Sequence, residues 1–477
     1  MDTLTVDVAV IGAGTAGLAA YRAAKSHGKR VVLIEGGAYG TTCARVGCMP
    51  SKLLIAAADA AHAIGLAPGF GVHVGTARID GKAVMARVRN ERDRFVGFVL
   101  DGVEKIPPAD RLRGYASFLD AKHLQVDQHT TVSADRIVIA TGSSPQMPPL
   151  LQAAGARVLV NDDIFSWQDL PAAVAVIGAG VIGLELGQAL HRLGVRVAIM
   201  GRDGKLAQLS DPAVRAAAIA CIADELDVRL NTQVLRVHAD GDGVTLQSRD
   251  GAGLERSERY DYLLAATGRI PNVGRLGLQH TGLALDARGL PLFDAHTMQC
   301  GDSTIFIAGD VDLERPVLHE AADQGRIAGD NAGRYPALQP GLRHTPLNIA
   351  FTDPQIAMVG AAHRDLKSGS FAIGEISFED QGRSRVMLQN RGLLRVYGEF
   401  ATQRLLGAEM VGPRAEHLAH LLAWACQNGM TIPQMLQMPF YHPVIEEGLR
   451  TALRDLAEKL LHGLPEIEHC TDCTPGM

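Results

Sequence analysis

A glycine-rich pattern that occurs twice restricts the folds open to this chain of 477 residues. The apolar segment VDVAVIGAG is followed by an alanine-rich helical segment, which ends near Gly28, and by a second apolar segment, VVLIE. The same order returns at residues 174–200, as AVAVIGAG, VIGLELGQALHRLG and VRVAIM. Strand, glycine turn, helix and strand in this order make up the βαβ unit of a nucleotide-binding fold. The sequence therefore predicts two α/β nucleotide-binding domains in one chain.

The first unit has each feature that a dinucleotide site requires. Gly12 permits a tight turn, Gly14 lets the backbone approach a pyrophosphate, and Gly17 lets the helix pack closely on the strand. Glu35 ends the second strand, where a carboxylate can accept hydrogen bonds from ribose hydroxyls. Because strand, helix and terminal acid agree, a glycine turn without a ligand is a poor explanation of this motif.

The second unit repeats the glycines but not the acid. Gly178, Gly180 and Gly183 occupy the three motif positions, and Gly201 takes the place of the acid. Arg202 follows directly. Loss of the acid and gain of a cation favour a nucleotide that carries a 2′-phosphate, although a single arginine is also compatible with a solvated loop.

Two cysteines follow the first unit. Cys43 and Cys48 lie at the start of a helical segment, PSKLLIAAADAAH. At this spacing two thiols can close a disulfide across one turn, and a helix N-terminus lowers a thiol pKa and favours the thiolate. Zinc is the main alternative, but a zinc site needs two more ligands, and no second CxxC or HxxxH motif lies near in the sequence. We therefore interpret the pair as redox-active.

The remaining cysteines carry weaker indications. Cys470 and Cys473 form a CxxC motif in the C-terminal tail. This motif is compatible with a second redox pair, half of a metal site, or exposed residues without a role. Cys221, Cys300 and Cys426 occur singly in apolar contexts and are most simply core residues.

His442-Pro443 near the C-terminus is followed by acidic residues. A thiol relay needs a base that takes and returns a proton, and histidine titrates in the right range. A carboxylate would orient the ring and raise its basicity. Taken alone, however, the motif is more typical of a loop that enters a helix, where early acids favour the helix dipole.

Three further apolar strands end in residues that suit a cofactor site. IVIATGS and LLAATGR end in Ala-Thr-Gly, and TIFIAGD ends in Gly-Asp. From about residue 345 the pattern changes to antiparallel strands and helices. The predicted fold class is α/β, with two Rossmann-like domains and a C-terminal α+β domain. The predicted boundaries are 1–150 and 275–345 for the first nucleotide domain, 151–274 for the second, 346–463 for the C-terminal domain and 464–477 for a tail.

Composition and charge narrow the classes of partner. A hydrophobic content of 47% and a charged content of 21% are typical of a globular protein with large cores. The formal net charge of −6 implies no broad basic surface, so we expect neither nucleic acid nor a membrane as partner. Asp2 and Asp7 do not suit a secretory signal, and we expect no apolar stretch long enough to span a bilayer. We therefore expect a cytoplasmic protein, in which seven cysteines form no disulfide framework.

Together, these motifs resemble those of the class I pyridine nucleotide–disulfide oxidoreductases, a family that includes dihydrolipoyl dehydrogenase, glutathione reductase and mercuric reductase. The resemblance covers the chain to about residue 460, keeps the motif order of the family and looks closest to a diverged dihydrolipoyl dehydrogenase. Besides the two glycine patterns, it rests on Thr42-Cys43, Gly47-Cys48-Met49-Pro50-Ser51-Lys52, Ala140-Thr141-Gly142, Thr267-Gly268-Arg269-Ile270-Pro271-Asn272, Gly309-Asp310 and His442-Pro443.

The resemblance implies FAD along the first unit, NAD(P) along the second, and no metal. It makes Cys48 the charge-transfer thiolate beside the flavin and Cys43 the interchange thiol that meets substrate. It places Lys52 by the flavin N5, paired with Glu185. It also implies that His442 and Glu447 form a base dyad that reaches the active site of the other subunit of an obligate homodimer. The implied cofactor-binding residues are Gly12, Gly14, Gly17, Glu35, Thr42, Lys52, Ala116, Thr141, Gly142, Asp310, Gly178, Gly180, Gly183, Arg202, Gly268 and Arg269.

The sequence departs from the family pattern around the first thiol. The usual Gly-Gly-Thr-Cys-x-Asn has Thr41 at its second glycine and Arg45 at its asparagine. Arg45 puts a cation beside the thiols, and we hypothesise that it lowers their pKa further. The usual His-Ala-His-Pro-Thr reads FYHPV here.

Three functional interpretations compete. The first is dihydrolipoyl dehydrogenase, which oxidises a protein-bound dihydrolipoyl group through the Cys43–Cys48 disulfide and FAD and reduces NAD(P)+; it implies a lipoylated carrier protein or domain as partner. The second is an NADPH-dependent reductase of a glutathione-like disulfide or of Hg(II). Mercuric reductases carry C-terminal cysteines, as this chain does, but characteristically lack the base that His442 retains. The third is a flavin-bearing binding protein without activity, which the retained thiols, Lys52 and His442 argue against.

Overall fold

The structure of the chain is a computed structural model that describes residues 2–75 and 77–462. By its contacts the chain forms two compact units. The predicted tail, with Cys470 and Cys473, lies outside the described residues, and the division into three domains stays a prediction. Unit 1 comprises Met1–Leu53, Arg87–Gln146 and Gly268–His344, and unit 2 comprises Leu54–Ala86, Met147–Thr267 and Thr345–Met477.

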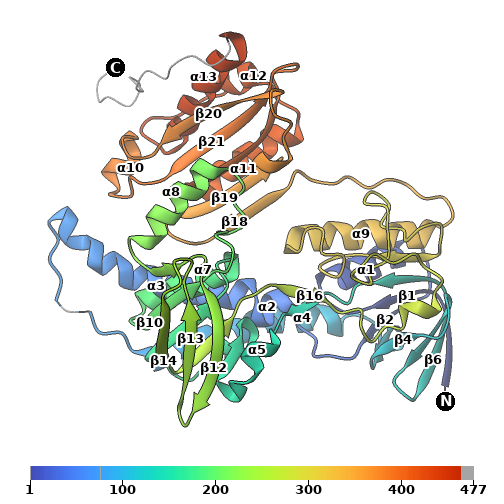
Figure 1. The fold of residues 1–477 in the computed structure, drawn as a ribbon. Coiled ribbons are helices and arrows are strands. Elements are labelled where there is room, and N and C mark those ends of the chain that lie inside the picture. Colours follow the sequence, from blue (N-terminus) through green and yellow to red (C-terminus); the bar gives the residue numbers. More distant parts are fainter. Residues whose placement is uncertain (1, 76, 463–477) are drawn as a thin grey trace. The chain divides into compact units, whose positions relative to one another are not determined.

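A seven-stranded sheet forms the centre of unit 1 (Figure 1). Because the residues of β1 alternate between the two faces of this sheet, Val8 and Val10 enter one core, and Ala9 and Ile11 enter the other. The parallel strands are β3 (Arg111–Arg113), β2 (Val31–Glu35), β1 (Asp2–Ile11), β6 (Thr130–Ile139) and β17 (Ile305–Ile307). The antiparallel strands are β5 (His123–Val126), beside β6, and β4 (Ala116–Phe118), beside β5.

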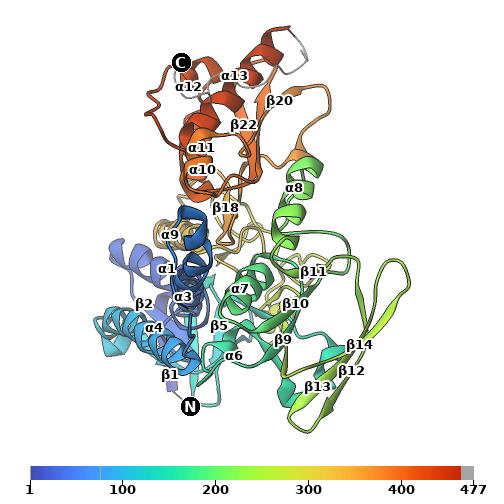
Figure 2. The ribbon, with the colours of Figure 1, turned by 90° about the vertical axis from the view of Figure 1, so that its left-hand side faces the viewer.

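Two helices of unit 1 pack closely on one another. α1 (Thr15–Ser26) and α9 (Leu318–Arg334) lie side by side in both views (Figures 1 and 2). A Cβ atom at Gly325 would overlap with the backbone of Ala16, and one at Gly329 would overlap with the backbone of Ala20. The glycines of α9 therefore allow its backbone to contact the backbone of α1, the helix that follows the first glycine turn.

A two-stranded ribbon marks the place where the chain leaves and re-enters unit 1. β7 (Ser143–Pro145) pairs antiparallel with β16 (Arg269–Pro271). Beyond the ribbon, the N–H of Gln146 donates to the carbonyl oxygen of Gly268 at 2.9 Å. The two crossing points of the chain are therefore bonded to each other.

Unit 2 contains a second parallel sheet, in the order β11-β10-β9-β15-β8. Its helices include α5 (Pro149–Gln152), α6 (Asn161–Ile164), α7 (Val181–Arg192) and α8 (Pro212–Ala223). Its strands are β8 (Val158–Val160), β9 (Ala173–Ile177), β10 (Arg196–Met200), β11 (Asp227–Arg229) and β15 (Tyr262–Ala265). An antiparallel sheet of β12 (Gln233–Asp240), β13 (Gly243–Arg249) and β14 (Glu255–Tyr260) lies beside this sheet (Figure 2); the sequence did not lead us to expect it.

The C-terminal part of unit 2 is an antiparallel sheet covered by helices. The strand order is β18-β19-β22-β21-β20, and the apolar faces of α11 and α13 complete its core. The strands are β18 (Leu347–Ala350), β19 (Gln355–Gly360), β20 (Phe371–Ser377), β21 (Leu393–Glu399) and β22 (Leu405–Gly412). The helices are α10 (Gly382–Val386), α11 (Ala415–Gln427), α12 (Ile432–Leu436) and α13 (Glu446–His462). Two parallel sheets and this antiparallel one confirm the predicted fold class.

The helices α2 (Thr42–Val46) and α3 (Cys48–Leu66) follow β2, and α4 (Gly81–Glu104) comes next. Among the described residues, Thr42–Phe70 is long and apolar enough to cross a bilayer, with a mean hydropathy of 1.5. The expectation that the chain lacks such a stretch is therefore wrong. Only the length and composition of this segment suggest that it could cross a membrane. For one helical segment of this kind, that evidence is weak.

Candidate active site

The first glycine turn has the geometry that the motif predicts. Gly12 has a φ of 105°, and a Cβ atom there would overlap with the carbonyl oxygen of Ala140. A Cβ atom at Gly17 would overlap with the carbonyl oxygen of Gly12. Gly14, by contrast, has no atom within 4 Å of a built Cβ. Two glycines therefore close the turn, and the third leaves open space at the N-terminus of α1.

Residues around this space suit a dinucleotide. The carboxylate of Glu35 accepts hydrogen bonds from the N–H of Ala13 at 2.8 Å and of Gly37 at 2.7 Å, which fixes it at the end of β2. The hydroxyl of Thr141 is buried and has no hydrogen-bond partner within the described residues. A buried hydroxyl without a partner is costly, so a bound group that completes it fits this position.

The segment after β6 is tied to two other predicted residues. Arg269 donates from Nε to the Ser143 hydroxyl at 2.8 Å, and its Nη2 donates to the Ser143 carbonyl oxygen at 2.6 Å. The Ser143 hydroxyl in turn donates to Asp310 Oδ2 at 3.4 Å. Burial raises the pKa of Asp310, and Arg269 opposes the shift. The structure thus brings together Arg269, Asp310 and the Ala-Thr-Gly turn.

For three other residues that we predicted to bind FAD, the structure gives a position and a burial but no contact that indicates a ligand. Ala116 is buried in the short strand β4, and Thr42 is the exposed first residue of α2. Lys52 is half-buried in α3, with Nζ 3.5 Å from the Ser51 hydroxyl. The roles of these residues stay predictions.

The second glycine turn repeats the first. Gly178 has a φ of 124°, and its Cβ would overlap with the carbonyl oxygen of Ala266. A Cβ at Gly183 would overlap with the carbonyl oxygen of Gly178, whereas Gly180 has open space. Gly201 follows β10 and is buried, with Leu230 Cδ2 3.0 Å from a built Cβ. The side chain of Arg202 is exposed beside it and available to a 2′-phosphate.

The two thiols lie at the starts of α2 and α3. Cys43 is half-buried and Cys48 is exposed, and the structure records no disulfide between them. A hydrogen bond to Cys48, followed by burial, raises the pKa of Cys43 far above its ordinary value. The expectation that the helix start lowers the thiol pKa is therefore wrong for Cys43, because the neighbouring sulfur and burial outweigh the backbone hydrogen bonds from Cys48 and Met49, which lower this pKa.

The structure places the side chain of Arg45 against the backbone of its own loop, and its effect on the thiol pKa stays a hypothesis. Its Nη1 donates to the carbonyl oxygen of Ala38 at 3.2 Å, and its side chain packs against Gly40. It is not among the largest causes of the shift in the pKa of Cys43. Thr41 caps α2 by accepting from the N–H of Ala44 at 3.3 Å, but it has a φ of 53° and a ψ of 150°. That region of backbone space is close to one that only glycine adopts easily.

The predicted base dyad is formed in unit 2. His442 Nδ1 lies 3.0 and 3.2 Å from the two carboxylate oxygens of Glu447, which is the second residue of α13. The N–H of Val444 also donates to Glu447 Oε2, at 3.1 Å. The Glu447 side chain is 13% exposed and that of His442 is 76% exposed. With Nδ1 held by the carboxylate, Nε2 is the nitrogen left for proton exchange with a substrate.

Glu185, which we predicted to pair with Lys52, lies on α7 and is shielded from solvent. It is buried, and its Oε1 accepts a hydrogen bond from the N–H of Phe351 at 2.9 Å. Lys52 and Cys43 belong to unit 1, whereas Glu185 and His442 belong to unit 2. The predicted pairing of Lys52 with Glu185 and the approach of His442 to the thiols therefore stay predictions. Within residues 2–75 and 77–462 no three His, Cys, Asp or Glu side chains are arranged to hold a metal ion.

Two protein families match the chain. Residues 6–325 match the family described as pyridine nucleotide-disulphide oxidoreductase, and residues 347–453 match its dimerisation domain. The chain belongs to this family. The earlier resemblance is therefore confirmed, and FAD and a pyridine nucleotide are the cofactors of this oxidoreductase. Bound FAD supplies two-electron transfer between the nicotinamide and the thiol pair.

Relatives within the family have more than one activity. A mercuric reductase of Acidithiobacillus ferrooxidans is 34% identical over 94% of this chain and 82% of its own length. A dihydrolipoyl dehydrogenase of Thermus scotoductus is 30% identical over 96% of this chain and 99% of its own length. Among solved structures, LpdA of Mycobacterium tuberculosis has a TM-score of 0.80 at 25% identity and covers 94% of this chain and 100% of its own. The flavoprotein disulfide reductase RclA of Escherichia coli shares the fold, with a TM-score of 0.80 at 23% identity over 95% of this chain and 98% of its own.

The match to the dimerisation domain supports a homodimer of this oxidoreductase. Large side chains on that domain are exposed in the single chain, with Trp424 of α11 at 65% and Tyr441, next to His442, at 80%. Exposed aromatic side chains of this size are typical of surfaces that a second subunit covers.

Sequence reasoning missed residues that hold the predicted site in place. Gln188 and Arg192 on α7 bind the turn between β18 and β19, and so does Glu185. No motif marks these residues, because their partners lie more than a hundred positions away in the sequence. The only local indication that Glu185, Gln188 and Arg192 act together was their spacing, which places them on one side of α7.

Proposed function

We propose that this protein is a dihydrolipoyl dehydrogenase, which oxidises a dihydrolipoyl group and passes the electrons to NAD(P)+. The observation that carries the proposal is the contact of His442 with Glu447, at 3.0 and 3.2 Å. A dithiol loses protons as it is oxidised, and an oriented base accepts them. A metal ion brings no such proton, so a retained dyad favours a dithiol substrate.

The proton steps follow from the residues of the chain. His442 takes a proton from one substrate thiol, and the resulting thiolate attacks Cys43 of the Cys43–Cys48 disulfide. Cys48 leaves as a thiolate. His442 passes the first proton to Cys43 and takes the proton of the second substrate thiol. That thiol attacks the substrate sulfur bound to Cys43, which closes the substrate disulfide and releases Cys43. The raised pKa of Cys43 suits this last step, because Cys43 leaves with a proton supplied by the dyad.

The proposal extends to the partner and the compartment. The dihydrolipoyl group is carried by a lipoylated protein or domain, and the protein acts in the cytoplasm.

A second candidate is an NADPH-dependent reductase of Hg(II) or of a glutathione-like disulfide. The identity of 34% to mercuric reductases favours the metal substrate, and the exposed Arg202 favours NADPH. His442 argues against Hg(II), because reduction of a metal ion gives this base no proton to move.

Turnover of free dihydrolipoamide with NAD+ and with NADP+, compared in one experiment, tests the proposal. We expect turnover with at least one of them. No turnover with either, together with rapid NADPH-driven reduction of Hg(II) or glutathione disulfide, would overturn it.

A pair of variants tests the base. His442→Ala should slow dihydrolipoamide turnover by about 10²–10⁴-fold, the usual contribution of general acid–base catalysis. His417→Ala is a matched control, because His417 is an exposed histidine near a carboxylate, 3.8 Å from Glu416, in the same domain. Equal rates for the two variants would remove His442 from the mechanism.

A further inference from the structure

One face of the nucleotide-binding helix α7 carries three buried polar side chains. Glu185, Gln188 and Arg192 are spaced three and four residues apart, which places them on one side of the helix. Glu185 and Gln188 are each 4% exposed, and the Arg192 side chain is 3% exposed. Polar groups buried this deeply need partners.

All three residues bind the short turn, residues 351–354, that joins β18 to β19. Glu185 Oε1 accepts from the N–H of Phe351 at 2.9 Å. Gln188 accepts from the N–H of Asp353 at 2.8 Å and donates to its carbonyl oxygen at 2.8 Å. Arg192 donates from Nη2 to Asp353 Oδ2 at 3.0 Å. The turn is therefore bound along the length of α7.

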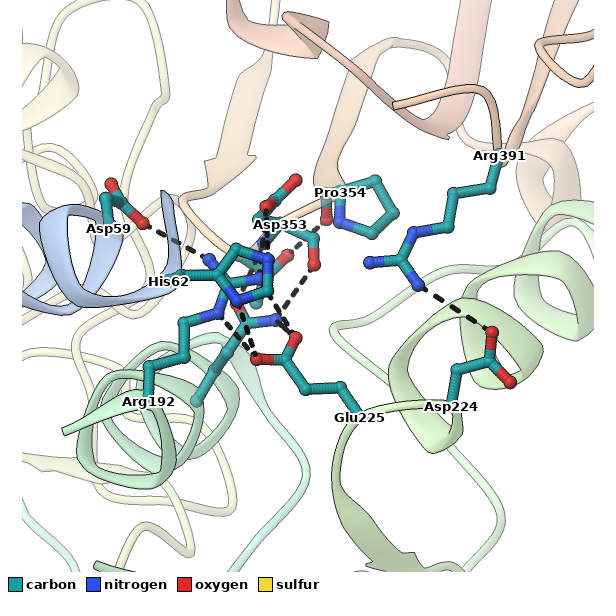
Figure 3. A network of polar contacts seen from close by, with 10 residues as sticks. Asp59, His62, Arg192, Asp224, Glu225, Asp353, Pro354 and Arg391 are labelled. Atoms are coloured by element: carbon teal, nitrogen blue, oxygen red, sulfur yellow. Dashed lines mark hydrogen bonds and ion pairs between the residues drawn. The ribbon is translucent and has the colours of Figure 1, made fainter. Parts of the chain in front are cut away.

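Arg192 is the centre of the network that Figure 3 shows. It binds Glu225 through two hydrogen bonds, of 2.6 and 2.9 Å, and Asp59 at 3.3 Å. Asp59 belongs to α3, and Glu225 follows α8. One guanidinium thus joins carboxylates from α3, from the end of α8 and from the turn that Glu185 contacts.

The charges of the network depend on Arg192. Burial opposes ionisation of Glu225, but hydrogen bonds from Arg192 prevail and lower the pKa of Glu225. His62 of α3 lies 3.8 Å from Glu225 and 3.9 Å from Asp353. Burial, and then the positive charge of Arg192, lower the pKa of His62, so it adds little positive charge at neutral pH. Without Arg192, three carboxylates would face one another.

We propose that Arg192 is a positioning residue for Glu185. It holds the 351–354 turn against α7, and the N–H of Phe351 in that turn fixes the Glu185 carboxylate. The inference rests on the predicted pairing of Glu185 with Lys52 beside the flavin N5. It does not depend on which thiol substrate the enzyme uses.

The test is the rate at which NAD(P)H reduces the bound FAD, measured by stopped flow on the holoenzyme without any thiol substrate. Arg192→Met should lower this rate at saturating nucleotide by at least about tenfold, because Glu185 loses its fixed orientation. Arg192→Lys should recover part of the rate, since it keeps the charge but not the two-point contact with Glu225. FAD content should be unchanged in both.

A double-mutant cycle separates positioning from general damage. If Arg192 acts through Glu185, Arg192→Met should have no further effect on the rate in a Glu185→Gln background. Effects that multiply would overturn the proposal, because they show that Arg192 acts independently of Glu185.

A control and a second variant complete the experiment. Arg391→Met removes the ion pair of Arg391 with Asp224, 3.7 Å apart at the edge of the same network, and should leave the rate unchanged. If Arg192→Met does not fold, Asp353→Ala serves in its place, because it removes the acceptor of the Arg192 hydrogen bond but keeps both backbone contacts with Gln188. A folded, FAD-loaded Asp353→Ala variant with the wild-type rate would overturn the proposal. This assay needs no dihydrolipoamide, so its outcome is independent of the proposed function.

Discussion

The two glycine turns of this protein have the same backbone and different surroundings. In each, the first glycine has a positive φ and leaves no room for a Cβ atom beside the carbonyl oxygen of an alanine, Ala140 or Ala266. In each, the middle glycine faces open space. After the second strand, however, the first turn has Glu35, held by two backbone N–H groups, and the second has Gly201.

A second difference lies at the neighbouring strand of each sheet. In unit 1, β17 pairs with β6 and is followed by Asp310 and Asp312. In unit 2 the same place beside β15 is taken by β8, which is followed by Asn161. The two turns share the backbone that a dinucleotide site requires, and we expect the side chains at the strand ends to decide which dinucleotide each one holds.

The largest effect is expected where a methyl group would overlap with the turn itself. Gly17→Ala and Gly183→Ala should each cost more than about 4 kcal/mol of the free energy of unfolding, since the added Cβ would overlap with a backbone carbonyl oxygen. Chemical denaturation measures this. Gly97→Ala is the control, because Gly97 has open space in α4, and it should stabilise the protein by about 0.5–1 kcal/mol. Equal stability of all three variants would show that the close packing is not required.

The next effect separates the two sites by cofactor. Gly14→Val and Gly180→Val should both fold, because both positions are open and have extended backbone. Gly14→Val should be purified without FAD, whereas Gly180→Val should keep FAD and raise the KM for NAD(P)H at least about tenfold, or about 1.4 kcal/mol. Flavin absorbance and steady-state kinetics check this. Loss of FAD from Gly180→Val would reverse the assignment of the two sites.

Asp312 should make the stability of unit 1 depend on pH. It is 5% exposed, Oδ2 has no hydrogen-bond partner within the described residues, and burial raises its pKa to about 6. Because the folded state binds this proton more tightly than the unfolded state, stability falls as pH rises from about 4 to about 6 and then levels off. Asp312→Asn should remove this fall, a relative gain of about 1–3 kcal/mol at pH 7. Chemical denaturation at several pH values measures the free energy of unfolding, and Asp302→Asn, at an exposed position, is the control. If the free energy of unfolding changed with pH in the same way in wild type and in Asp312→Asn, the prediction would be contradicted.

A smaller effect concerns the nicotinamide nucleotide. If Arg202 contacts a 2′-phosphate, Arg202→Ala should lower the ratio of kcat/KM for NADPH to that for NADH about tenfold, or about 1.4 kcal/mol. Gly201→Glu should shift the ratio in the same direction by restoring an acid. Arg236→Ala, an exposed arginine on β12, is the control. An unchanged ratio in Arg202→Ala would mean that the preference is set elsewhere.

The smallest effect concerns the segments that follow β2 and β10, the second strands of the two βαβ units. The first contains Thr41 at a φ of 53°, and the second contains Ala207 and Gln208, also with positive φ. Thr41→Gly should relieve about 1 kcal/mol of backbone strain and lose a few tenths of a kcal/mol from the cap on α2. Thermal unfolding of this variant would show a slightly higher Tm. A lower Tm would mean that the cap contributes more than the strain costs.

The sequence could predict whatever depends on neighbouring residues. Both βαβ units, the strand ends with Ala-Thr-Gly, and the change to antiparallel strands near residue 345 are local patterns, and the structure confirms them. The pairing of His442 with Glu447 was also within reach, because the two residues are five positions apart and Glu447 lies in the first turn of α13.

The sequence could not predict contacts that depend on the folded arrangement. Arg192 and Asp353 are separated by 161 positions, and no pattern near either indicates the other. Arg45 was predicted to act on the thiols because it is their neighbour in sequence, but its side chain turns to Ala38. The raised pKa of Cys43 likewise depends on where the Cys48 sulfur lies, which spacing alone leaves open.

The ribbon of β7 and β16 has a consequence for how such a chain arises. Because Gln146 and Gly268 are hydrogen-bonded to each other, the segment between them begins and ends at one point. A copy of a βαβ unit can be inserted into an ancestral gene at such a point without separating any strands of the host sheet. The same property would allow residues 147–267 to be replaced by the corresponding segment of a relative with the opposite nucleotide preference.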